Sequence, residues 1–323
     1  MWGNRLGWGI SAGIVIVVVG ALMILSLAGS RTPPTDFSNQ QNLAAVQLPI
    51  APDQVFPMTD PTDAGPLYRQ AISDYLARPS KYLVYLGDNT ATSDDANKLA
   101  AVGLLRQAAT CSKADVFQSH PEQIVNYTAK PELNALGKLG DVMLHAGLLA
   151  KVNKQNDLAT SDYEAAFALG AKLYAERLTH DEYAAAVNLM GGASQAMVGL
   201  YADDPAKANA WANFNVARRK YDEEHIDPIW KVLGAIGLDS AEEHAGDVFV
   251  FAQSAQDRMW RVEGVLKMGR LKYEGARKAD QRDALVVATQ MANSDPDTVV
   301  RLAAAAAREL TPEIFRQLSS DSN

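Results

Sequence analysis

Hydrophobic positions form one long run near the amino terminus. Residues 6–30 contain no ionisable side chain, and the stretches 14–19 and 21–25 are almost purely aliphatic. A backbone surrounded by lipid must satisfy its own hydrogen bonds, and about twenty helical residues cross the hydrocarbon core. The pattern therefore predicts a single transmembrane anchor at 6–30, preceded by a cytoplasmic amino terminus at 1–5.

The direction and fate of this segment depend on its flanks. Arg5 precedes the run, whereas Arg31 follows it together with Asp36, so we expect the body to be exported. A cleavable export signal is the alternative, because residues 26–28 (Ser-Leu-Ala) offer the small side chains that a signal peptidase accepts. The run exceeds the roughly 7 to 15 apolar residues of such signals, which favours a retained anchor.

Gly9 and Gly13 lie about one helical turn apart within the anchor. This spacing lets two transmembrane helices approach closely and predicts a weak homodimer. Small residues are also common in isolated spans, so a simple anchor is the alternative.

Proline marks the segment after the anchor. Seven of the fourteen prolines fall between Pro33 and Pro66, among Thr, Ser, Gln and Asn, without a hydrophobic period. Proline-rich chain is extended at about 3 Å per residue, so we expect a semi-rigid spacer at 31–60. The alternative is that part of it lies against the body, which the apolar pair Val55 and Phe56 would favour.

Windows rich in Ala and Leu fill the rest of the chain. They run for about 14 to 24 residues between turn signals, a length typical of helices and not of strands. We expect an all-α domain at 61–323, built as a helical repeat or bundle. The segment 81–86 is a candidate strand without a partner. The predicted helices are 61–77, 94–111, 121–127, 131–153, 161–178, 181–202, 205–224, 228–236, 240–278 (broken), 281–293, 296–309 and 312–319.

Two kinds of helix start support this assignment. Asp-Pro pairs place a hydrogen-bond acceptor at the cap and proline in the first turn, and they occur at 60–61, 204–205, 227–228 and 295–296. Capping boxes satisfy two amides through a hydroxyl and a carboxylate three residues later, and they occur at 119–122, 161–164, 179–182 and 240–243. Connections between the predicted helices are short at 178–181 and 202–204, so these helices must run antiparallel, as in hairpins and solenoids.

The window 251–273 has apolar residues on more than one side. At 100° per residue, one stripe covers an arc of about 80° and comprises Phe251, Ala255, Met259, Val262, Leu266, Gly269 and Tyr273. Val250 and Trp260 fall outside this stripe. We therefore expect a helix packed between two layers.

Charge and cysteine content exclude several classes of protein. Residues 51–323 carry 28 Lys and Arg against 37 Asp and Glu. Nucleic-acid binding needs a surplus of cations facing phosphate, so it is not expected. The single cysteine, Cys111, excludes an intrachain disulfide and is expected to be a buried, inert thiol. No glycine-rich phosphate loop or dinucleotide fingerprint occurs, so no cofactor is predicted.

One segment resembles a known repeat family. From Asp295 to Leu310 the chain has Asp-Pro, then Val-Arg, then paired alanines and a leucine. This order is similar to the second helix of a HEAT-type repeat, and with the preceding helix it would complete a hairpin at 281–310. The resemblance implies that Asp297 and Arg301 bond between successive repeats and are structural.

A second resemblance lies upstream. Four residues are spaced as in the second helix of a tetratricopeptide repeat, namely Ala193, Met197, Leu200 and Pro205. Position 180, where the first helix of that family has leucine, is a histidine here. Both families are interaction platforms, so both resemblances imply protein binding and not catalysis.

Candidate catalytic and metal-binding groups are few. Glu-Glu-His triplets at 223–225 and 242–244 would form a metal site if the helix between them folded back. Charged helix ends are ordinary, however, so no metal is predicted. Ser194 lies in a helical window, without the preceding strand that a nucleophile elbow needs. His145, among apolar neighbours, is expected in the core or an interface.

The main candidate binding surface is basic. Residues 258–282 hold eight cations against three acids, within an otherwise acidic domain. An anionic ligand, lipid headgroup or acidic protein would dock there. The cations flank the apolar stripe, so long side chains lying beside a packed seam are the alternative. The candidate residues are Arg258, Arg261, Lys267, Arg270 and Lys272.

Together these patterns predict a membrane-anchored helical-repeat protein that acts as a protein-protein interaction scaffold or assembly factor. No catalytic activity is expected, and the predicted partners are other proteins and the membrane. The alternative is a helical enzyme, or a ligand- or metal-binding receptor, with its site near the Glu-Glu-His triplets and the basic segment 258–282.

Overall fold

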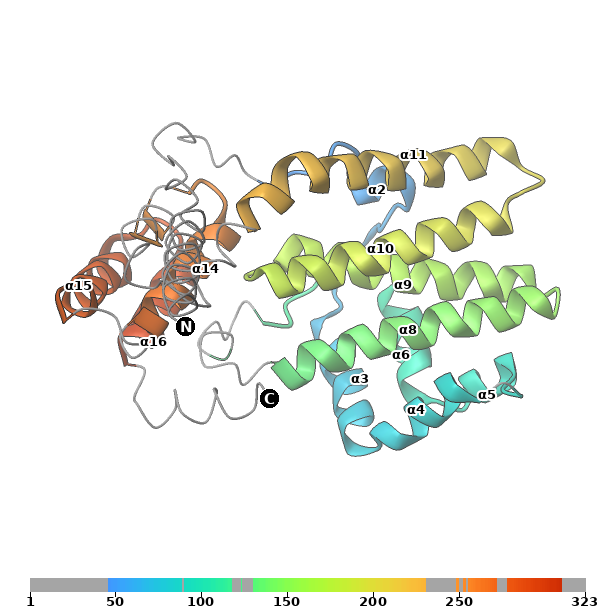
Figure 1. The fold of residues 1–323 in the computed structure, drawn as a ribbon. Helices are drawn as coiled ribbons and strands as arrows, with labels where there is room; N and C mark the ends of the chain where they lie inside the picture. Colours follow the sequence, from blue (N-terminus) through green and yellow to red (C-terminus); the bar gives the residue numbers. More distant parts are fainter. Residues whose placement is uncertain are drawn as a thin grey trace, which may run out of the picture. The chain divides into compact units, whose positions relative to one another are not determined.

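The computed structural model describes residues 46–88, 90–117, 123, 130–230, 248–249, 252–253, 255–271 and 278–309. These residues are mostly helical, which agrees with the predicted all-α class (Figure 1). The predicted anchor at 6–30, with Gly9 and Gly13, lies outside them. Among the helices that are described, none combines the length and the hydrophobicity needed to cross a bilayer.

Four long helices lie side by side and alternate in direction, as the short connections predicted (Figure 1). They are α8 (Lys130–Val152), α9 (Asn156–Glu176), α10 (His180–Leu200) and α11 (Pro205–Tyr221). Glycines allow close approach within this array. A Cβ on Gly170 of α9 would lie 2.7 Å from the Ala186 carbonyl oxygen of α10. About one turn before Gly170 on α9, the Phe167 ring meets the rings of Trp211 and Phe214 from α11, with centroids 4.9 and 5.2 Å away.

The starts of these helices follow local hydrogen bonding. Thr179 caps α10, since its hydroxyl accepts the Glu182 amide at 3.3 Å and the Glu182 carboxylate accepts the Thr179 amide at 2.9 Å. Asp204 caps α11 by accepting the Lys207 amide. Both predicted starts are confirmed. The capping box predicted at 161–164 is wrong, because α9 begins five residues earlier, after a tight turn in which Lys154 has a φ of 62°.

Helix α11 does not end where the sequence predicted. It continues into a π-helical turn, η2 (Asp222–Ile226), and then through residues 227–230. In the wider turn the Asp227 amide bonds to the Asp222 carbonyl, five residues back. Proline at 228 lacks an amide and crowds the carbonyl four residues before it, and a widened turn relieves that conflict. The Asp-Pro pair at 227–228 is therefore not a helix start.

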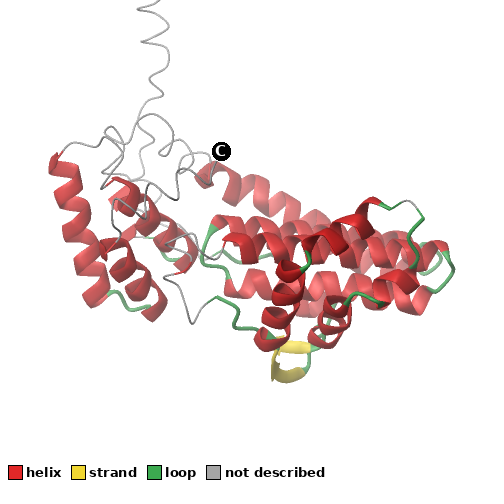
Figure 2. Cartoon of the chain, turned by 90° about the horizontal axis from the view of Figure 1, so that it is seen from below, coloured by secondary structure: helices red, strands yellow, loops and turns green. Residues whose placement is uncertain are grey.

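Shorter elements precede the long helices. They are α2 (Pro52–Val55), β1 (Asp60–Asp63), α3 (Gly65–Ala77), α4 (Pro79–Gly87), α5 (Ser93–Asn97), α6 (Ala100–Ala108) and β2 (Cys111–Lys113). The two strands pair in parallel, with Asp60 opposite Cys111, and are drawn in yellow in Figure 2. They are the only strands among the described residues.

Three predictions fail in this part of the chain. The Asp-Pro pair at 60–61 begins a strand, and helix α3 starts later, where Pro66 occupies the first turn. The predicted helix 94–111 is two helices, separated by Leu99 in an extended conformation, and its end belongs to β2. The candidate strand 81–86 is helix α4, which buries Tyr82 and Tyr85 one turn apart.

The last described helices are α14 (Arg258–Leu271), α15 (Lys278–Ser294) and α16 (Thr298–Glu309). Helix α14 packs against both α15 and α16. Met259, Val262 and Leu266 of the predicted stripe are buried, and so is Trp260 on the other side. The expectation of a helix packed between layers is thus confirmed for α14, whereas Phe251 and Tyr273 lie outside the described residues.

Residues 46–59 lie against the helices. Val46 and Leu48 are buried, and α2 contacts α11. This part of the predicted spacer follows the alternative, in which ordered chain packs on the body. The expectation of an extended spacer remains a prediction for residues 31–45, which the structure does not describe.

Candidate functional site

A cavity of about 700 Å³ opens between helix α9 and the chain around the two strands. Met58 and Asp63 line one side, residues 112–115 after β2 line another, and α9 contributes Lys172 and Glu176. The volume lies within the range of about 300 to 1,000 Å³ that is common for small-molecule sites.

Lys172 is the unusual group in this cavity. Its side chain stems from a helix that is buried on most sides, and only 4% of the residue is exposed. The ammonium nitrogen lies 3.3 Å from the carbonyl oxygen of Ala109 and 3.4 Å from the sulfur of Met58. Burial lowers the pKa of Lys172 to about 8. Ala109 caps the carboxyl end of α6, so a cation here also meets the negative end of that helix.

Two carboxylates in the cavity wall hold backbone amides. Glu176 accepts hydrogen bonds from the Val116 amide, at 3.0 and 3.1 Å, and from the Phe117 amide. Asp63 accepts the amides of Gly65 at 2.8 Å and Asp115 at 3.0 Å. Among the described residues, no carboxylate lies within ion-pair distance of Lys172. The carboxylates thus fix the cavity walls and leave the lysine without a counterion.

A second cavity, of about 300 Å³, lies beside the π-helical turn. The Tyr183 hydroxyl donates to Asp222, which also forms an ion pair with Arg218 at 2.6 Å. His180 stacks on Trp230 with ring centroids 3.7 Å apart, and burial lowers the pKa of His180 to about 4. A neutral imidazole stacked on indole is a packing group at physiological pH.

Only one of the two predicted metal triplets, 223–225, falls within the described residues. Glu223 lines the second cavity, and its whole triplet lies within the π-helical turn. The triplet at 242–244 lies outside the described residues. Within those residues no three His, Cys, Asp or Glu side chains gather in a way that would hold a metal ion.

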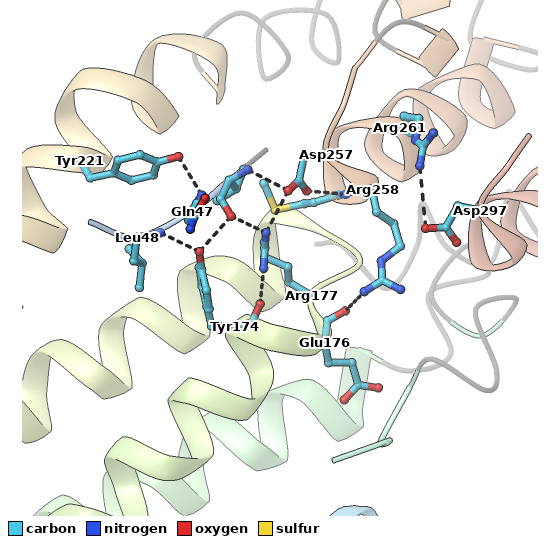
Figure 3. Close-up of polar contacts among 12 residues, drawn as sticks. Gln47, Leu48, Tyr174, Glu176, Arg177, Tyr221, Asp257, Arg258, Arg261 and Asp297 are labelled. Carbon is cyan, nitrogen blue, oxygen red and sulfur yellow. Dashed lines mark hydrogen bonds and ion pairs between the residues drawn. The ribbon is translucent and has the colours of Figure 1, made fainter. Parts of the chain in front are cut away.

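The predicted basic patch lies on and after α14. Arg258 donates to the Glu176 carbonyl oxygen at 3.3 Å, and Arg261 reaches Asp297 at 3.8 Å (Figure 3). Arg261 also lies 3.5 Å from Asp295. Lys267 is half-buried. The side chain of Arg270, and Lys272 altogether, lie outside the described residues. Arg258 and Arg261 thus have partners within the described chain, and an anionic partner for this patch stays a prediction.

Asp297 and Arg301 both bond at the start of α16. The Asp297 carboxylate accepts the Val299 amide at 2.8 Å and caps the helix, besides receiving Arg261 from α14. Arg301 donates to the carbonyl oxygen of Asp295 at 2.6 Å and to the Thr298 hydroxyl at 2.7 Å. Asp297 therefore connects two helices, whereas the bonds of Arg301 are local.

A short stretch of extended chain, residues 46–48, is pinned by side chains from three segments, and we call it the strap (Figure 3). The Val46 amide donates to Asp257 at 2.8 Å, and the Val46 carbonyl accepts from Tyr174 and Arg177. The Gln47 amide donates to the Tyr221 hydroxyl at 3.1 Å. The strap thereby connects the end of α9, the end of α11 and the start of α14.

The remaining sequence candidates are packing groups. Ser194 lies inside α10 and donates to the Met190 carbonyl at 2.7 Å, so it is not presented by a strained turn. Cys111 is buried, and burial raises the pKa of its thiol, as an inert thiol requires. His145 is half-buried, and its ring meets the Tyr85 ring edge to face, with centroids 5.2 Å apart.

Sequence reasoning missed Lys172, although a signal was present. Residues 165–174 are apolar except for this lysine, so any helix containing them buries a lone cation on an apolar face.

Aliphatic side chains remain exposed at the corner formed by α3 and α4. Leu83 and Val84 are 51% and 66% exposed, and Leu76, near the end of α3, is 43% exposed. The three lie within nine positions of the chain. Single exposed apolar residues are ordinary, but neighbouring ones at the surface are typical of contact sites with other proteins.

Comparisons with known proteins found no relative of this chain. No family model, no curated protein and no solved structure matches the chain.

Proposed function

We propose that this protein is a membrane-held helical domain that binds another protein and so acts as a scaffold or assembly factor. The observation that carries the proposal is at the α3–α4 corner, where Leu76, Leu83 and Val84 are each exposed. Burying such side chains against a partner would favour the complex by roughly 25 cal/mol for each Å² of apolar surface removed from water. The uncharged run at 6–30 supplies the attachment to the membrane.

The antiparallel helices support the same proposal. Stacked helical hairpins present long side surfaces without requiring a catalytic centre, and known proteins of this architecture use them to bind partners. Helix α4 buries Tyr82 and Tyr85 against the body while its other side remains in solvent. A partner would therefore meet a surface held rigidly from beneath.

The test is chemical crosslinking of the full-length protein in its own membranes, followed by identification of what is captured. A double variant, Leu83→Glu with Val84→Glu, should reduce capture of the partner by about tenfold or more, since charged groups would be buried in the interface. Asn209→Glu adds a charge at an exposed position of α11, outside the corner, and should leave capture unchanged. Equal capture by all three proteins, or monomer alone from the wild type, would refute the proposal.

A further inference from the structure

Lys172 differs from the other deeply placed cations of the described chain. Arg106 pairs with Asp162 at 2.7 Å, and Arg177 pairs with Asp257 at 2.9 Å. Lys172 is more buried than either arginine, yet its polar neighbours are one carbonyl oxygen and one thioether. An ammonium without a counterion is poorly stabilised away from water, so burial favours the neutral amine. A neutral amine carries a lone pair and is a nucleophile.

The cavity beside this amine suits a small uncharged molecule. Its walls include apolar groups such as Met58 and Ala171. The carboxylates of Asp63 and Glu176 are occupied by backbone amides, but their negative charge remains and opposes an anionic ligand. An uncharged ligand with an electrophilic carbon would avoid this repulsion and could use the amine.

We propose that this cavity binds a small aldehyde or ketone and that the amine of Lys172 adds to its carbonyl carbon. The nitrogen–carbon bond forms while one proton passes from the nitrogen to the carbonyl oxygen, which gives a carbinolamine. Loss of this oxygen as water, with the nitrogen giving up a proton, leaves an imine. The sum is amine plus carbonyl compound giving imine plus water, without oxidation or reduction. This site is separate from the α3–α4 corner and does not depend on the proposed scaffold function.

The competing account makes Lys172 purely structural, as a cation that bonds the carboxyl end of α6 through Ala109. A structural cation would keep its proton and would not react with carbonyl compounds near neutral pH. The two accounts therefore differ in reactivity, in pH dependence and in saturation by the ligand.

The experiment treats the full-length folded protein with benzaldehyde and then with sodium borohydride, which reduces an imine to a stable secondary amine. Peptide mass mapping locates the label. At pH 8 about half of Lys172 would be neutral, against roughly one part in 250 of an ordinary exposed lysine, so Lys172 should be labelled at least tenfold faster than Lys138 or Lys207. Its labelling should reach half of its maximum near pH 8 and should saturate with benzaldehyde concentration.

Lys172→Arg serves as the control, because arginine retains the positive charge but forms no such imine. It should lose the fast label and keep the labelling of the exposed lysines. Failure to label Lys172 while exposed lysines react, or labelling that rises only above about pH 10, would overturn the proposal. Labelling that grows in proportion to benzaldehyde without saturating would show a reactive amine without a binding site, and would also overturn it. Each of these outcomes is read on wild-type protein and does not require the variant to fold.

Discussion

Arg177 and Asp257 form an ion pair, with Nη2 and Oδ2 2.9 Å apart, although 80 positions separate them in the chain. The same carboxylate oxygen accepts the amide of Val46, and the same guanidinium nitrogen donates to the Val46 carbonyl at 2.6 Å. Both side chains are largely buried, with 14% and 8% of their surface exposed. One charged pair thus holds the strap, the end of α9 and the start of α14 together.

Removing the carboxylate should destabilise the protein strongly. Asp257→Ala leaves Arg177 without its counterion and the Val46 and Met259 amides without their acceptor. Breaking a buried pair by removing one partner costs about 3 to 5 kcal/mol, so we expect a loss of roughly 3 kcal/mol in the free energy of unfolding, measured with urea. Protease should also cleave near residues 46–50 at a lower concentration than in the wild type.

An exposed pair provides the matched control. Lys207 and Asp204 are 3.6 Å apart, with 61% and 44% of their side chains exposed. Lys207→Ala should cost less than about 1 kcal/mol, because water screens the pair. Equal losses of unfolding free energy from Asp257→Ala and Lys207→Ala would show that the buried strap network stabilises the protein no more than an exposed ion pair does.

Stability should fall between about pH 4.5 and pH 7 because of Glu182. The pKa of this carboxyl is raised from 4.5 to about 7, chiefly by burial and also by the neighbouring carboxylates of Glu176 and Glu263, while the hydrogen bonds from the Leu178 and Thr179 amides act in the opposite direction. In this window the folded state binds more protons than the unfolded state, so raising the pH disfavours folding. The contribution is at most roughly 3 kcal/mol.

Comparison of the wild type with Glu182→Gln isolates this effect, since the variant cannot titrate at this position. The difference between their free energies of unfolding should change between pH 4.5 and pH 7. As the pH rises, the wild type should become less stable relative to Glu182→Gln. Parallel curves from pH 4.5 to pH 7 would contradict the assignment.

Close packing of α9 on α10 can be tested at one glycine. Gly170→Ala would place a Cβ 2.7 Å from the Ala186 carbonyl oxygen and 2.9 Å from the Met190 side chain. Overpacking of this kind costs about 1 to 3 kcal/mol. The control is Gly103→Ala in α6, where the new Cβ meets nothing within 4 Å, and this change should stabilise the helix by about 0.5 to 1 kcal/mol. Changes of the same sign at both sites would mean that α9 and α10 do not pack this closely.

Compartment is tested by protease added to intact cells. An anchor at 6–30 with an exported body predicts that a tag after residue 323 is digested and that a tag before residue 1 is protected. Protection of both tags, with the protein recovered in the soluble cytosolic fraction, would remove the membrane part of the proposal.

Local signals predicted the long helices well. The predicted windows 131–153 and 181–202 match α8 and α10 to within two residues at each end. Thr179 and Asp204 succeeded as caps because their side chains bond the nearby amides. Short connections then left antiparallel packing as the one solution for α9 to α11.

Predictions failed where tertiary contacts overrode local preference. Tyr82 and Tyr85 read as strand residues, but burying both on one side of α4 requires helical spacing. Asp60 reads as a cap, yet its amide bonds to Thr110, and pairing with β2 keeps the chain extended. The proline at 228 is typical of a helix start, and residue type alone does not predict the π-helical turn found there.

For the candidate sites too, the sequence predicted local features but not the contacts between distant segments. The basic segment was evident from composition, but only the structure shows Arg261 engaged by Asp295 and Asp297. The lone lysine at 172 was visible, whereas the cavity beside it depends on β1, β2 and α9, which are far apart in the sequence. A single sequence offers no way to bring those segments together.

The most direct test of the protein-binding proposal is site-specific photo-crosslinking in living cells. A photoreactive phenylalanine analogue at position 84, at the exposed corner, should give a reproducible crosslink to one other protein. The same group at position 138 of α8, where the lysine side chain is also half exposed, should not. A discrete partner captured only from position 84 is the result we expect, and uncrosslinked monomer from both positions, or the same products from both, would contradict it.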